Sequence, residues 1–551
     1  MMAANLRPLL AQHLQQRLQA FTEGFRHNLA LIGPPGSGKT FQLEQLLRPA
    51  PAGLTVIYCR LYRESSRSFL TRLLSTILET AAGPPEGREP QAVSTLMRTL
   101  EETAPRLAAG ARAVEPLLLR RLYGEAFNRT LDLIPLLIEL KRQPCVLVLD
   151  EFLALEELGL AHAFHELGKR VMTWPSTLFI LASSSPHRAR VILRERLQLL
   201  FGQFELLTLD MLDPATAGPW MQQELRGLRG AKHHVPFFWH WLGGHPWYLA
   251  VLMKRLREVA AVQRTLELND AVLRQAMWDV LGSPEGTLAQ WCAGRCEQLA
   301  RTRSGARAVE VLLSLAEGAR TATEVARRCG RSGVAPALQF LLEHDLVSRK
   351  GTCWMITDPV LRGWLTVVLS QQRRAPGTGE DDAARRERFD RYLQGLWQQW
   401  VQTTALSFPD QVTRLLSQFR DDTLSIDSKT GRLPAFRSVT SRPSPDGRGA
   451  YLIADGPGRW CCAVFEGRVA EDAVAGFDAF CRTQQPRPAR KVLIVRAPLE
   501  PNTRLIAKAA NIWVWEPEDL RLLMELYRPA APSGPPAAPR RTARSRAHAG
   551  A

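Results

Sequence analysis

The N-terminal part of the chain alternates short apolar runs with longer segments of helical spacing. The spacing of apolar and polar positions predicts helices between the runs, above all over residues 64–142. Strands that alternate with helices predict a parallel sheet covered by helices on both faces, so we expect an α/β fold. The runs that suit buried strands are residues 28–32, 54–59, 146–149, 178–182 and 206–209.

Beyond the last of these runs the pattern changes twice. Residues 213–282 have helical spacing, interrupted at Gly243-Gly-His-Pro246. The helices then become short, and residues 346–356 read as a hairpin that turns at Gly351. Short helices followed by a hairpin are the arrangement of a winged helix. The three helices are expected at residues 306–316, 322–329 and 332–343.

The C-terminal third reads as a further mixed domain at residues 386–526. A polar linker at 373–385 precedes it, and a tail rich in Pro, Ala and Arg at 527–551 follows it. The composition of that tail predicts disorder. The strands expected in this domain are residues 450–454, 460–465, 491–495 and 511–515.

Composition narrows the class of protein. Of the 551 residues, 45% are hydrophobic and 23% are charged, which excludes wholesale disorder. No apolar run reaches the ~18–20 residues of a membrane helix, and the N-terminus lacks the pattern of a secretory signal. The nine cysteines are scattered without a C-x-x-C spacing, which argues against a disulfide framework or a zinc site. We therefore expect a cytoplasmic protein with no membrane partner.

The net charge of +17 is compatible with nucleic-acid binding but does not demonstrate it. Among the basic residues, 62 are Arg and only nine are Lys. This skew, together with abundant Ala, Gly and Pro, is typical of a GC-rich coding bias. Composition therefore leaves nucleic acid as one possible partner among others.

The segment that carries chemistry follows the first apolar run and opens a helix. It reads GPPGSGKT and fits the spacing G-x-x-x-x-G-K-[ST] in full. Glycines let backbone N–H groups turn onto a phosphate without Cβ clashes, and the helix N-terminus adds positive partial charge. Lys39 would reach the β- and γ-phosphates of ATP, and the Thr40 hydroxyl would hold Mg²⁺. The predicted nucleotide-binding residues are Gly33, Pro34, Pro35, Gly36, Ser37, Gly38, Lys39, Thr40 and Phe41.

An acidic partner for this loop stands at the end of the apolar run 146–149. Asp150 would supply the second Mg²⁺ ligand, and the carboxylate of Glu151 could polarise an attacking water. A polar group after the next strand would probe the γ-phosphate, and among the serines at 183–185 we favour Ser184. A helix-capping acidic pair and a plain serine turn are the alternatives. The predicted catalytic residues are Glu151, Lys39 and Ser184, and the predicted metal ligands are Thr40 and Asp150.

These motifs carry a family resemblance. GPPGSGKT, VLVLDEF and FILASSS, in this order, resemble AAA+ and STAND-type P-loop ATPases. Residues 243–249 are similar to the lid signature of the archaeal ATPase family, and residues 356–364 to the segment that closes its winged helix. The resemblance implies an initiator-like ATPase core that uses ATP and Mg²⁺. It further implies a C-terminal domain of the PD-(D/E)xK nuclease type, which many members carry.

The sequence departs from the family at the arginine that acts on a neighbour's nucleotide. Where members carry a Leu-Tyr-Gly-Arg-like box, residues 200–203 read Leu-Phe-Gly-Gln. Gln203 supplies no charge, so activation in trans by this position is in doubt and the oligomeric state stays open. The arginines that could substitute are Arg188, Arg190, Arg194 and Arg196, although we favour the interpretation that they form a solvated basic helix face.

A second departure concerns the nuclease-like domain. Its chemistry needs an acid on one strand and Glu-x-Lys on the next, to hold Mg²⁺ and activate water. Glu466 is present, but Arg468 replaces the lysine and stays protonated. Tyr451 occupies the place of the first acid, with Asp455 four residues later. We expect a nuclease-like fold with its chemistry lost; a working variant using Asp455 and Glu466, or an unrelated α/β domain, are the alternatives.

The predicted winged helix has an unusual recognition helix. Residues 332–343 contain Gln339 but are otherwise mostly apolar or small. Basic residues flank the helix instead, which favours phosphate contact over base reading. Sequence-tolerant binding of duplex DNA, contact with a protein partner and an inert spacer all remain open. The flanking residues are Arg327, Arg328, Arg331, Arg349 and Lys350.

The function predicted from these features is an ATP-hydrolysing switch whose winged helix and C-terminal domain engage DNA or a protein. A nucleotide-bound scaffold or transcriptional regulator without catalysis is the alternative, and a metal-dependent nuclease is the third. The expected organisation is an ATPase core at 1–212, a helical lid at 213–282, a winged helix at 283–372, the linker at 373–385, the nuclease-like domain at 386–526 and the tail at 527–551.

Overall fold

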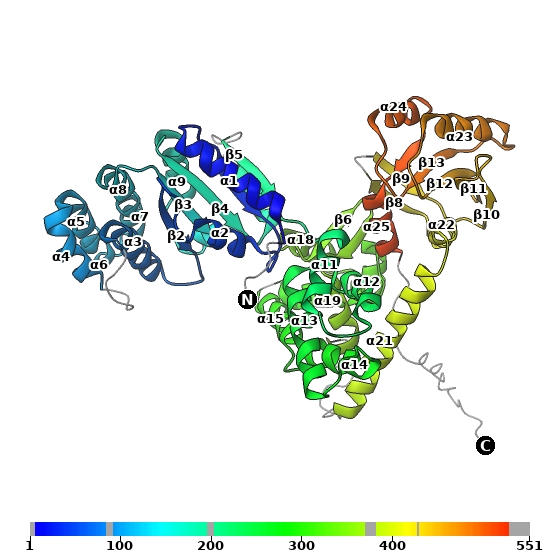
Figure 1. Ribbon diagram of the computed structural model, residues 1–551, viewed down its shortest axis with the longest axis horizontal. Coiled ribbons are helices and arrows are strands. Elements are labelled where there is room, and N and C mark those ends of the chain that lie inside the picture. Colours follow the sequence, from blue (N-terminus) through cyan, green and yellow to red (C-terminus); the bar gives the residue numbers. More distant parts are fainter. Residues whose placement is uncertain are drawn as a thin grey trace, which may run out of the picture. The chain divides into compact units, whose positions relative to one another are not determined.

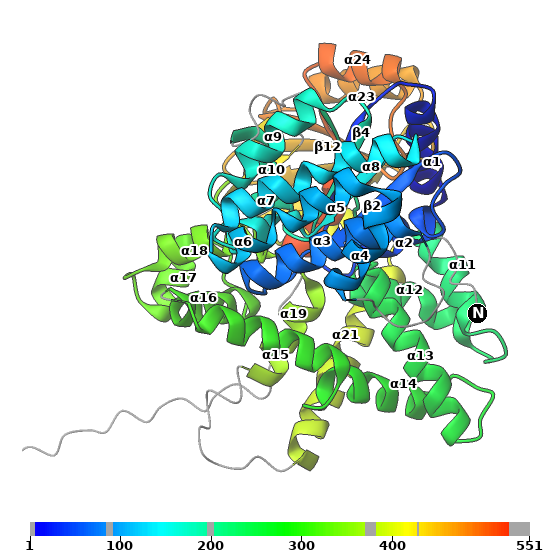
Figure 2. The same ribbon diagram turned by 90° about the vertical axis from the view of Figure 1, so that its left-hand side faces the viewer.

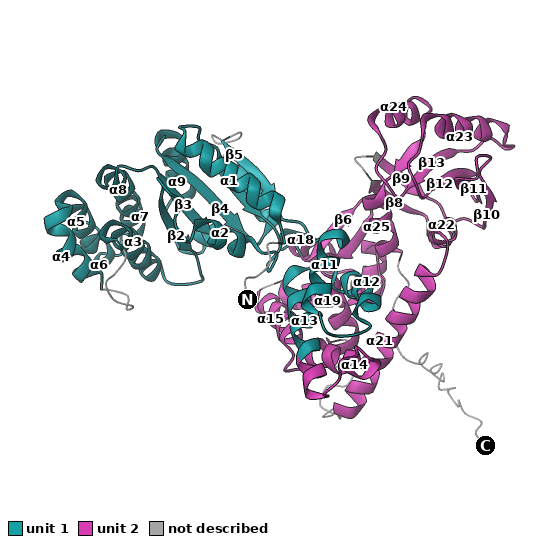
Figure 3. Cartoon of the chain, viewed as in Figure 1, with its two compact units in different colours: residues 1–257, 342–345 teal, residues 258–341, 346–551 magenta. Residues whose placement is uncertain are grey.

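The computed structural model describes residues 6–83, 92–195, 203–302, 304–369, 382–426 and 429–527. The chain divides into two compact units, residues 1–257 with 342–345 and residues 258–341 with 346–551 (Figure 3). Each unit contains its own sheet and its own buried apolar clusters.

Unit 1 is built on a five-stranded parallel sheet in the order β2-β3-β4-β1-β5 (Figure 1). Each strand overlaps an apolar run of the sequence, so the predicted parallel sheet is confirmed. The strands are β1 (Asn28–Ile32), β2 (Thr55–Arg60), β3 (Cys145–Asp150), β4 (Thr177–Ser183) and β5 (Phe204–Thr208).

The two faces of this sheet bury alternate residues of each strand. On β3, Val146 and Val148 join a cluster with helices α1 (Pro8–Thr22) and α2 (Lys39–Leu47). Leu147 and Leu149 point to the other face, against α3 (Ser66–Ala82) and α9 (Ala163–Thr173). Burial on both faces explains why the strands read as continuous apolar runs.

A helical insert separates β2 from β3. It begins with α3, which packs on β2, and Figure 2 shows its helices together on one side of unit 1. The remaining helices are α4 (Val93–Thr103), α5 (Pro105–Arg112), α6 (Glu115–Leu119), α7 (Tyr123–Leu131) and α8 (Leu133–Lys141).

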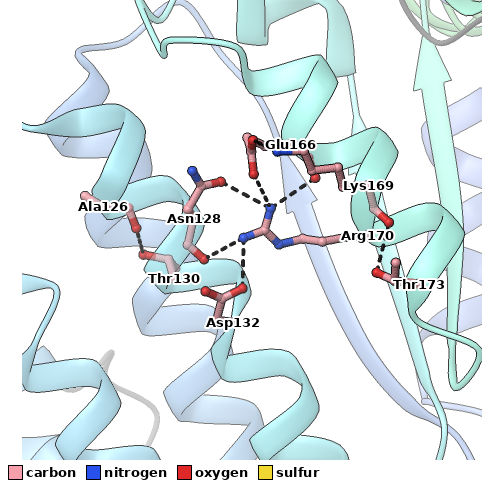
Figure 4. Close-up of polar contacts among 8 residues, drawn as sticks. All are labelled: Ala126, Asn128, Thr130, Asp132, Glu166, Lys169, Arg170 and Thr173. Carbon is pink, nitrogen blue, oxygen red and sulfur yellow. Dashed lines mark hydrogen bonds and ion pairs between the residues drawn. The ribbon is translucent and has the colours of Figure 1, made fainter.

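A buried arginine joins this insert to α9 (Figure 4). The Arg170 guanidinium donates to the Asn128 carbonyl at 3.1 Å and to an Asp132 carboxylate oxygen at 2.8 Å. It also stacks on Trp174, with its central carbon 5.5 Å from the ring centroid. Because Arg170 is only 8% exposed, these partners compensate the loss of its hydration.

The helices that follow the sheet extend across the boundary between the units, which falls within α13 and therefore inside the segment 213–282 expected to form one lid. They are α11 (Pro214–Glu224), α12 (Ala231–Leu242), α13 (Pro246–Val262), α14 (Asp270–Met277), a π-helical turn (Trp278–Gly282) and α15 (Thr287–Ala300). Another helix, α10 (Pro186–Glu195), lies between β4 and β5.

Three short helices and a hairpin follow, here called the helix–hairpin segment (residues 305–356). All of this segment belongs to unit 2 except residues 342–345, which belong to unit 1. All predicted elements of the segment are present, and the hairpin turns at Gly351 as expected. They are α16 (Gly305–Ala316), α17 (Ala322–Cys329), α18 (Val334–Glu343), β6 (Val347–Lys350) and β7 (Cys353–Ile356); α19 (Pro359–Trp364) and a π-helical turn (Leu365–Leu369) follow.

The rest of unit 2 is a mixed sheet in the order β10-β11-β12-β13-β14. β10 and β12 are antiparallel to β11, whereas β12, β13 and β14 are parallel. Its elements are α21 (Asp382–Thr404), α22 (Phe408–Leu416), β8 (Asp422–Ile426), β9 (Lys429–Leu433), β10 (Ser438–Pro443), β11 (Gly449–Asp455), β12 (Trp460–Phe465), α23 (Glu471–Thr483), β13 (Arg490–Val495), α24 (Pro501–Ala509), β14 (Trp513–Trp515) and α25 (Pro517–Leu526).

The four strands predicted in this domain are present, but other elements were missed. β10 is an exposed edge strand with polar residues on both faces, and β8 with β9 forms a separate hairpin, so neither showed a buried apolar run. α21 begins at Asp382, inside the stretch 373–385 expected to be a linker. Residues 373–381 of that linker and 528–551 of the predicted tail lie outside the described residues.

The hairpin of the helix–hairpin segment is docked on β8. The Thr352 backbone N–H donates to the Thr423 carbonyl at 2.8 Å, and the Thr352 hydroxyl accepts from the Thr423 N–H at 3.2 Å. Cys353 belongs to the same apolar cluster as the C-terminal sheet. A Cβ at Gly351 would lie 2.2 Å from the Thr423 carbonyl oxygen, so only glycine allows this approach.

Replacing Gly351 with Ala should therefore destabilise the protein more than the same change at Gly447. Both glycines have positive φ, +67° and +66°, but nothing lies within 4 Å of a Cβ at Gly447. The shared backbone strain costs about 1–2 kcal/mol, and disturbing the Thr352–Thr423 hydrogen bonds adds about 1–3 kcal/mol at Gly351. Denaturant unfolding measures both, and equal losses would mean that the docking is loose.

Candidate functional site

The loop from Gly33 to Gly38 connects the carboxyl end of β1 to the first turn of α2. Gly36 and Gly38 have φ of +74° and +97°, a region that other residues rarely adopt. A Cβ at Gly33 would lie 2.7 Å from the Leu209 carbonyl oxygen, so the strand must leave the sheet through a glycine. The Gly33 N–H donates to the Ser183 carbonyl at 3.2 Å, which fixes the loop over β4.

Lys39 lies inside the loop. Its side chain is 3% exposed, and its ammonium donates to the carbonyls of Gly33 and Pro34 at 2.8 and 3.0 Å. Burial lowers the pKa of Lys39 to about 8, against the opposing effect of the Glu151 and Asp150 carboxylates. The ammonium is therefore held by uncharged oxygens in a place where an anion would stabilise its charge.

Thr40 and Asp150, the two predicted metal ligands, are in direct contact. The Thr40 hydroxyl donates to Asp150 Oδ2 at 2.7 Å, and the Tyr58 hydroxyl donates to the same oxygen at 3.0 Å. Asp150 is fully buried at the end of β3, and no hydrogen-bond donor lies within reach of its Oδ1. Burial, followed by the Asp150 carboxylate, raises the pKa of Tyr58 far above its usual value, which keeps this phenol protonated.

Glu151 and Ser184 also lie together. Glu151 has φ of +60°, which is uncommon for a residue with a side chain. Its carboxylate accepts from the Ser184 N–H at 3.0 Å and, through the other oxygen, from the Ser184 hydroxyl. Of the neighbouring serines, Ser183 is buried in β4, where its hydroxyl accepts from the Ser185 N–H at 3.1 Å.

The other predicted loop residues divide between the interior and the surface. Ser37 is fully buried, and its hydroxyl has no hydrogen-bond partner. Phe41 is 40% exposed on α2, while Pro34 and Pro35 are half-buried. The structure thus brings Lys39, Thr40, Asp150, Glu151 and Ser184 to one edge of the sheet, at the carboxyl ends of β1, β3 and β4.

One residue at this site was not singled out from the sequence. His245 belongs to the Gly243–Pro246 turn, far along the chain, and its Nε2 lies 2.9 Å from the Pro35 carbonyl oxygen. The sequence marked this turn as a helix interruption and as similar to the family's lid signature, but neither observation assigned His245 a contact with the loop. Only the contact between this turn and the Gly33–Gly38 loop, here called the phosphate loop after its predicted ligand, identifies it.

Two of the arginines that could act on a neighbouring nucleotide form ion pairs within this chain. Arg188 pairs with Glu156, and Arg194 pairs with Glu195 at 3.2 Å. Arg190 is exposed on α10, and Gln203 is the first described residue before β5. Residues 196–202, which include Arg196 and most of the Leu-Phe-Gly-Gln box, lie outside the described residues.

The acids proposed for a working nuclease do not meet. β11 and β12 are antiparallel, with Ala454 opposite Trp460 and Gly449 opposite Phe465. Asp455 and Glu466 therefore lie at opposite ends of this pair, seven residue positions and roughly 24 Å apart at about 3.4 Å per residue. Asp455 accepts instead from the Arg459 guanidinium at 2.7 Å, so the structure does not support the alternative of a working nuclease that uses Asp455 and Glu466.

Most basic side chains of the helix–hairpin segment have intramolecular partners. Arg328 donates to the carbonyls of Ser314 and Glu317 at 3.4 and 3.0 Å. Arg349 donates to the Gly351 carbonyl and stacks on Trp354. The exposed residues that remain for a partner are Arg327, Arg331 and Lys350.

The exposed face of α18, the predicted recognition helix, carries Ala335, Pro336, Gln339 and Glu343. Base edges are usually read by Arg, Asn or Gln side chains, and only Gln339 could serve here. This face is therefore poorly suited to reading sequence.

The segment that contains the site matches a known protein family. Residues 7–180 match the protein family described as AAA ATPase domain. This segment contains the phosphate loop, Lys39, Thr40, Asp150 and Glu151. No curated protein matches the chain.

Several solved structures are distantly similar. A Walker-type ATPase of Pyrococcus abyssi aligns with 17% identity and a TM-score of 0.45, over 65% of this chain and 95% of that one. The Aeropyrum pernix ORC1 protein in complex with DNA aligns with 14% identity and a TM-score of 0.37, over 68% of this chain and 95% of that one. The ORC2 protein of the same organism, in its ADP form, aligns with 15% identity and a TM-score of 0.39, over 68% of this chain and 96% of that one. Similarity at these TM-scores carries no argument about function.

Two structural features are absent from the described residues: a cluster of metal-binding side chains and a membrane-spanning helix. No group of three or more His, Cys, Asp or Glu side chains within the described ranges is placed to hold a metal ion. No helix in the part of the chain that the structure describes is long and apolar enough to cross a membrane.

The buried ammonium of Lys39 predicts proton uptake when a nucleotide binds. With a pKa of about 8 in the free protein, roughly half of the molecules carry the charge at pH 8, and phosphates favour the charged form. Binding of Mg-ADP at pH 8 should therefore take up roughly half a proton per site, and at pH 6 almost none from Lys39. Calorimetric titration in two buffers of different ionisation enthalpy measures this uptake, and its absence at pH 8 would contradict the assignment.

Proposed function

We propose that unit 1 binds ATP with Mg²⁺ and hydrolyses it. The observation that carries this proposal is the Thr40–Asp150 contact beneath a glycine loop, with one buried carboxylate oxygen left without a donor. The Asp150 carboxylate is fully buried, and its ion pair with the half-exposed Arg60 is long, at 4.0 Å. Burying a carboxylate with so little compensation is costly, and an ion at this place would compensate it. The match of residues 7–180 to an AAA ATPase domain supports the same function.

The residues present fit a magnesium ion. Hydroxyl and carboxylate oxygens are the ligands that Mg²⁺ accepts, and it keeps several waters besides one or two protein ligands. Thr40 Oγ1 and Asp150 would hold the ion, while Tyr58 fixes the carboxylate from the side. A bound Mg²⁺ would neutralise charge on the β- and γ-phosphates.

The chain's own groups would perform the remaining tasks. The amides of residues 36–40 cradle the phosphates, and Lys39 exchanges the carbonyls of Gly33 and Pro34 for phosphate oxygens. Glu151 aligns the attacking water and accepts its proton. Ser184 positions Glu151 through two hydrogen bonds, which assigns it a role beside the γ-phosphate contact expected from the sequence.

We propose that unit 2 is the output of this switch. In this proposal the helix–hairpin segment is a winged helix whose wing, docked on β8, is joined firmly to a nuclease-like domain without nuclease chemistry. Duplex DNA, if bound, is contacted through its phosphates by Arg327, Arg331 and Lys350, because α18 presents small and acidic residues.

The catalytic proposal is tested by replacing Glu151 with Gln. The change should leave Mg-ADP affinity unaltered and lower ATP turnover by ~100-fold or more, since the amide cannot accept the proton. Steady-state phosphate release and calorimetry give the two quantities. Turnover equal to that of the parent protein would refute the assigned base, whereas a parent that retains nucleotide without turnover would favour the scaffold alternative.

The DNA proposal is tested by replacing Arg327 and Arg331 with Ala. The double variant should bind duplex DNA more weakly at low salt. The slope of log affinity against log salt concentration should fall by the amount expected for about two lost phosphate contacts. Arg328→Ala is the matched control, because its guanidinium already caps α16. Equal losses in both proteins, or no DNA binding by the parent, would contradict a role in DNA contact.

A further inference from the structure

The turn between α12 and α13 holds the outer side of the phosphate loop. His245 Nε2 lies 2.9 Å from the Pro35 carbonyl oxygen, although 210 positions separate the two residues in the chain. His245 is 7% exposed, so this contact is largely shielded from water. A Cβ at Gly36 would lie 2.7 Å from the imidazole Cε1, so the ring fills the space beside the loop.

The imidazole is held in one orientation. Its ring stacks on Tyr248, with centroids 3.7 Å apart and an angle of 16° between the planes. The Tyr248 backbone N–H points at Nδ1 from 3.4 Å, so Nδ1 is the acceptor. Nε2 then carries the proton and donates it to the Pro35 carbonyl.

The contact also fixes the next amide of the loop. The Pro35–Gly36 peptide is trans, and in a trans peptide the C=O and N–H groups point in opposite directions. With the Pro35 carbonyl held by His245, the Gly36 N–H is directed away from the turn and toward the phosphate side. Gly36 has φ of +74° and no side chain to restrain it, so this peptide would otherwise rotate easily.

The same turn is anchored at the end of the sheet domain. The Leu212 N–H donates to the Gly244 carbonyl at 2.9 Å, and the Trp239 indole donates to the Leu212 carbonyl at 2.7 Å. A Cβ at Gly244 would lie 2.3 Å from that carbonyl oxygen. The turn is therefore fixed both at residue 212, after β5, and at the phosphate loop.

We propose that His245 is a positioning residue for nucleotide binding: by holding the Pro35 carbonyl outward, it preorganises the Gly36 amide to bind a phosphate. This inference rests on the proposed nucleotide site and adds the residue that links the α12–α13 turn to it. A loop whose amide is already oriented loses less conformational entropy on binding, so affinity depends on His245 although it does not touch the nucleotide.

The test measures Mg-ADP affinity of the full-length protein by calorimetry. His245→Ala should weaken binding about 3–10-fold, the usual range for one lost hydrogen bond. His245→Gln, which keeps an N–H donor of similar reach, should restore most of the affinity. His245→Leu fills similar space without a donor and should bind as weakly as His245→Ala. Affinity in His245→Leu equal to that of His245→Gln would mean that the ring only fills space.

Asp213→Ala is the matched control. Asp213 caps α11 through the Thr216 N–H at 2.6 Å, and its side chain is exposed. It should lower the melting temperature and leave Mg-ADP affinity unchanged. Equal loss of affinity in Asp213→Ala and His245→Ala, or parent-like affinity in His245→Ala, would overturn the inference. A parent protein that binds no Mg-ADP would instead refute the proposed function itself.

Discussion

The hydrogen bond between Thr40 and Asp150 is the interaction on which the site depends. It joins the first turn of α2 to the end of β3, although β4 lies between β1 and β3 in the sheet. The contact forms only because all these strands are parallel and end at the same edge. Registers that pair Ile32 with Ser183 and Asp150 with Ala182 bring the three strand ends level.

Burial gives this edge its electrostatic character. Asp150 is fully buried and Lys39 is 3% exposed, yet the two charged groups bond to hydroxyls and carbonyls, not to each other. Both would gain from a ligand that carries negative phosphates and a cation together. Burial of the Lys39 ammonium away from water lowers its pKa to about 8, and a bound anion would favour the charged form.

Unit 2 shows how packing changes the meaning of a motif. The hairpin expected as the wing of a DNA reader contributes Cys353 to the core of the C-terminal sheet, and its tip bonds to β8. Arg328 and Arg349, counted from the sequence as basic groups available to DNA, cap helix and hairpin carbonyls. Side chains that bond within the chain have less freedom to bind phosphate.

The sequence by itself determined the parallel sheet, the glycine-rich loop and the acid that ends β3, because each leaves a local pattern: an apolar run, a glycine spacing, a carboxylate at a strand end. Only the tertiary structure decided that Ser184 holds Glu151, that His245 reaches Pro35, and that Asp455 and Glu466 lie apart. It also decided the exposed strand β10. The physical reason is that these features depend on strand register and on contacts between distant segments, which no spacing along the chain records.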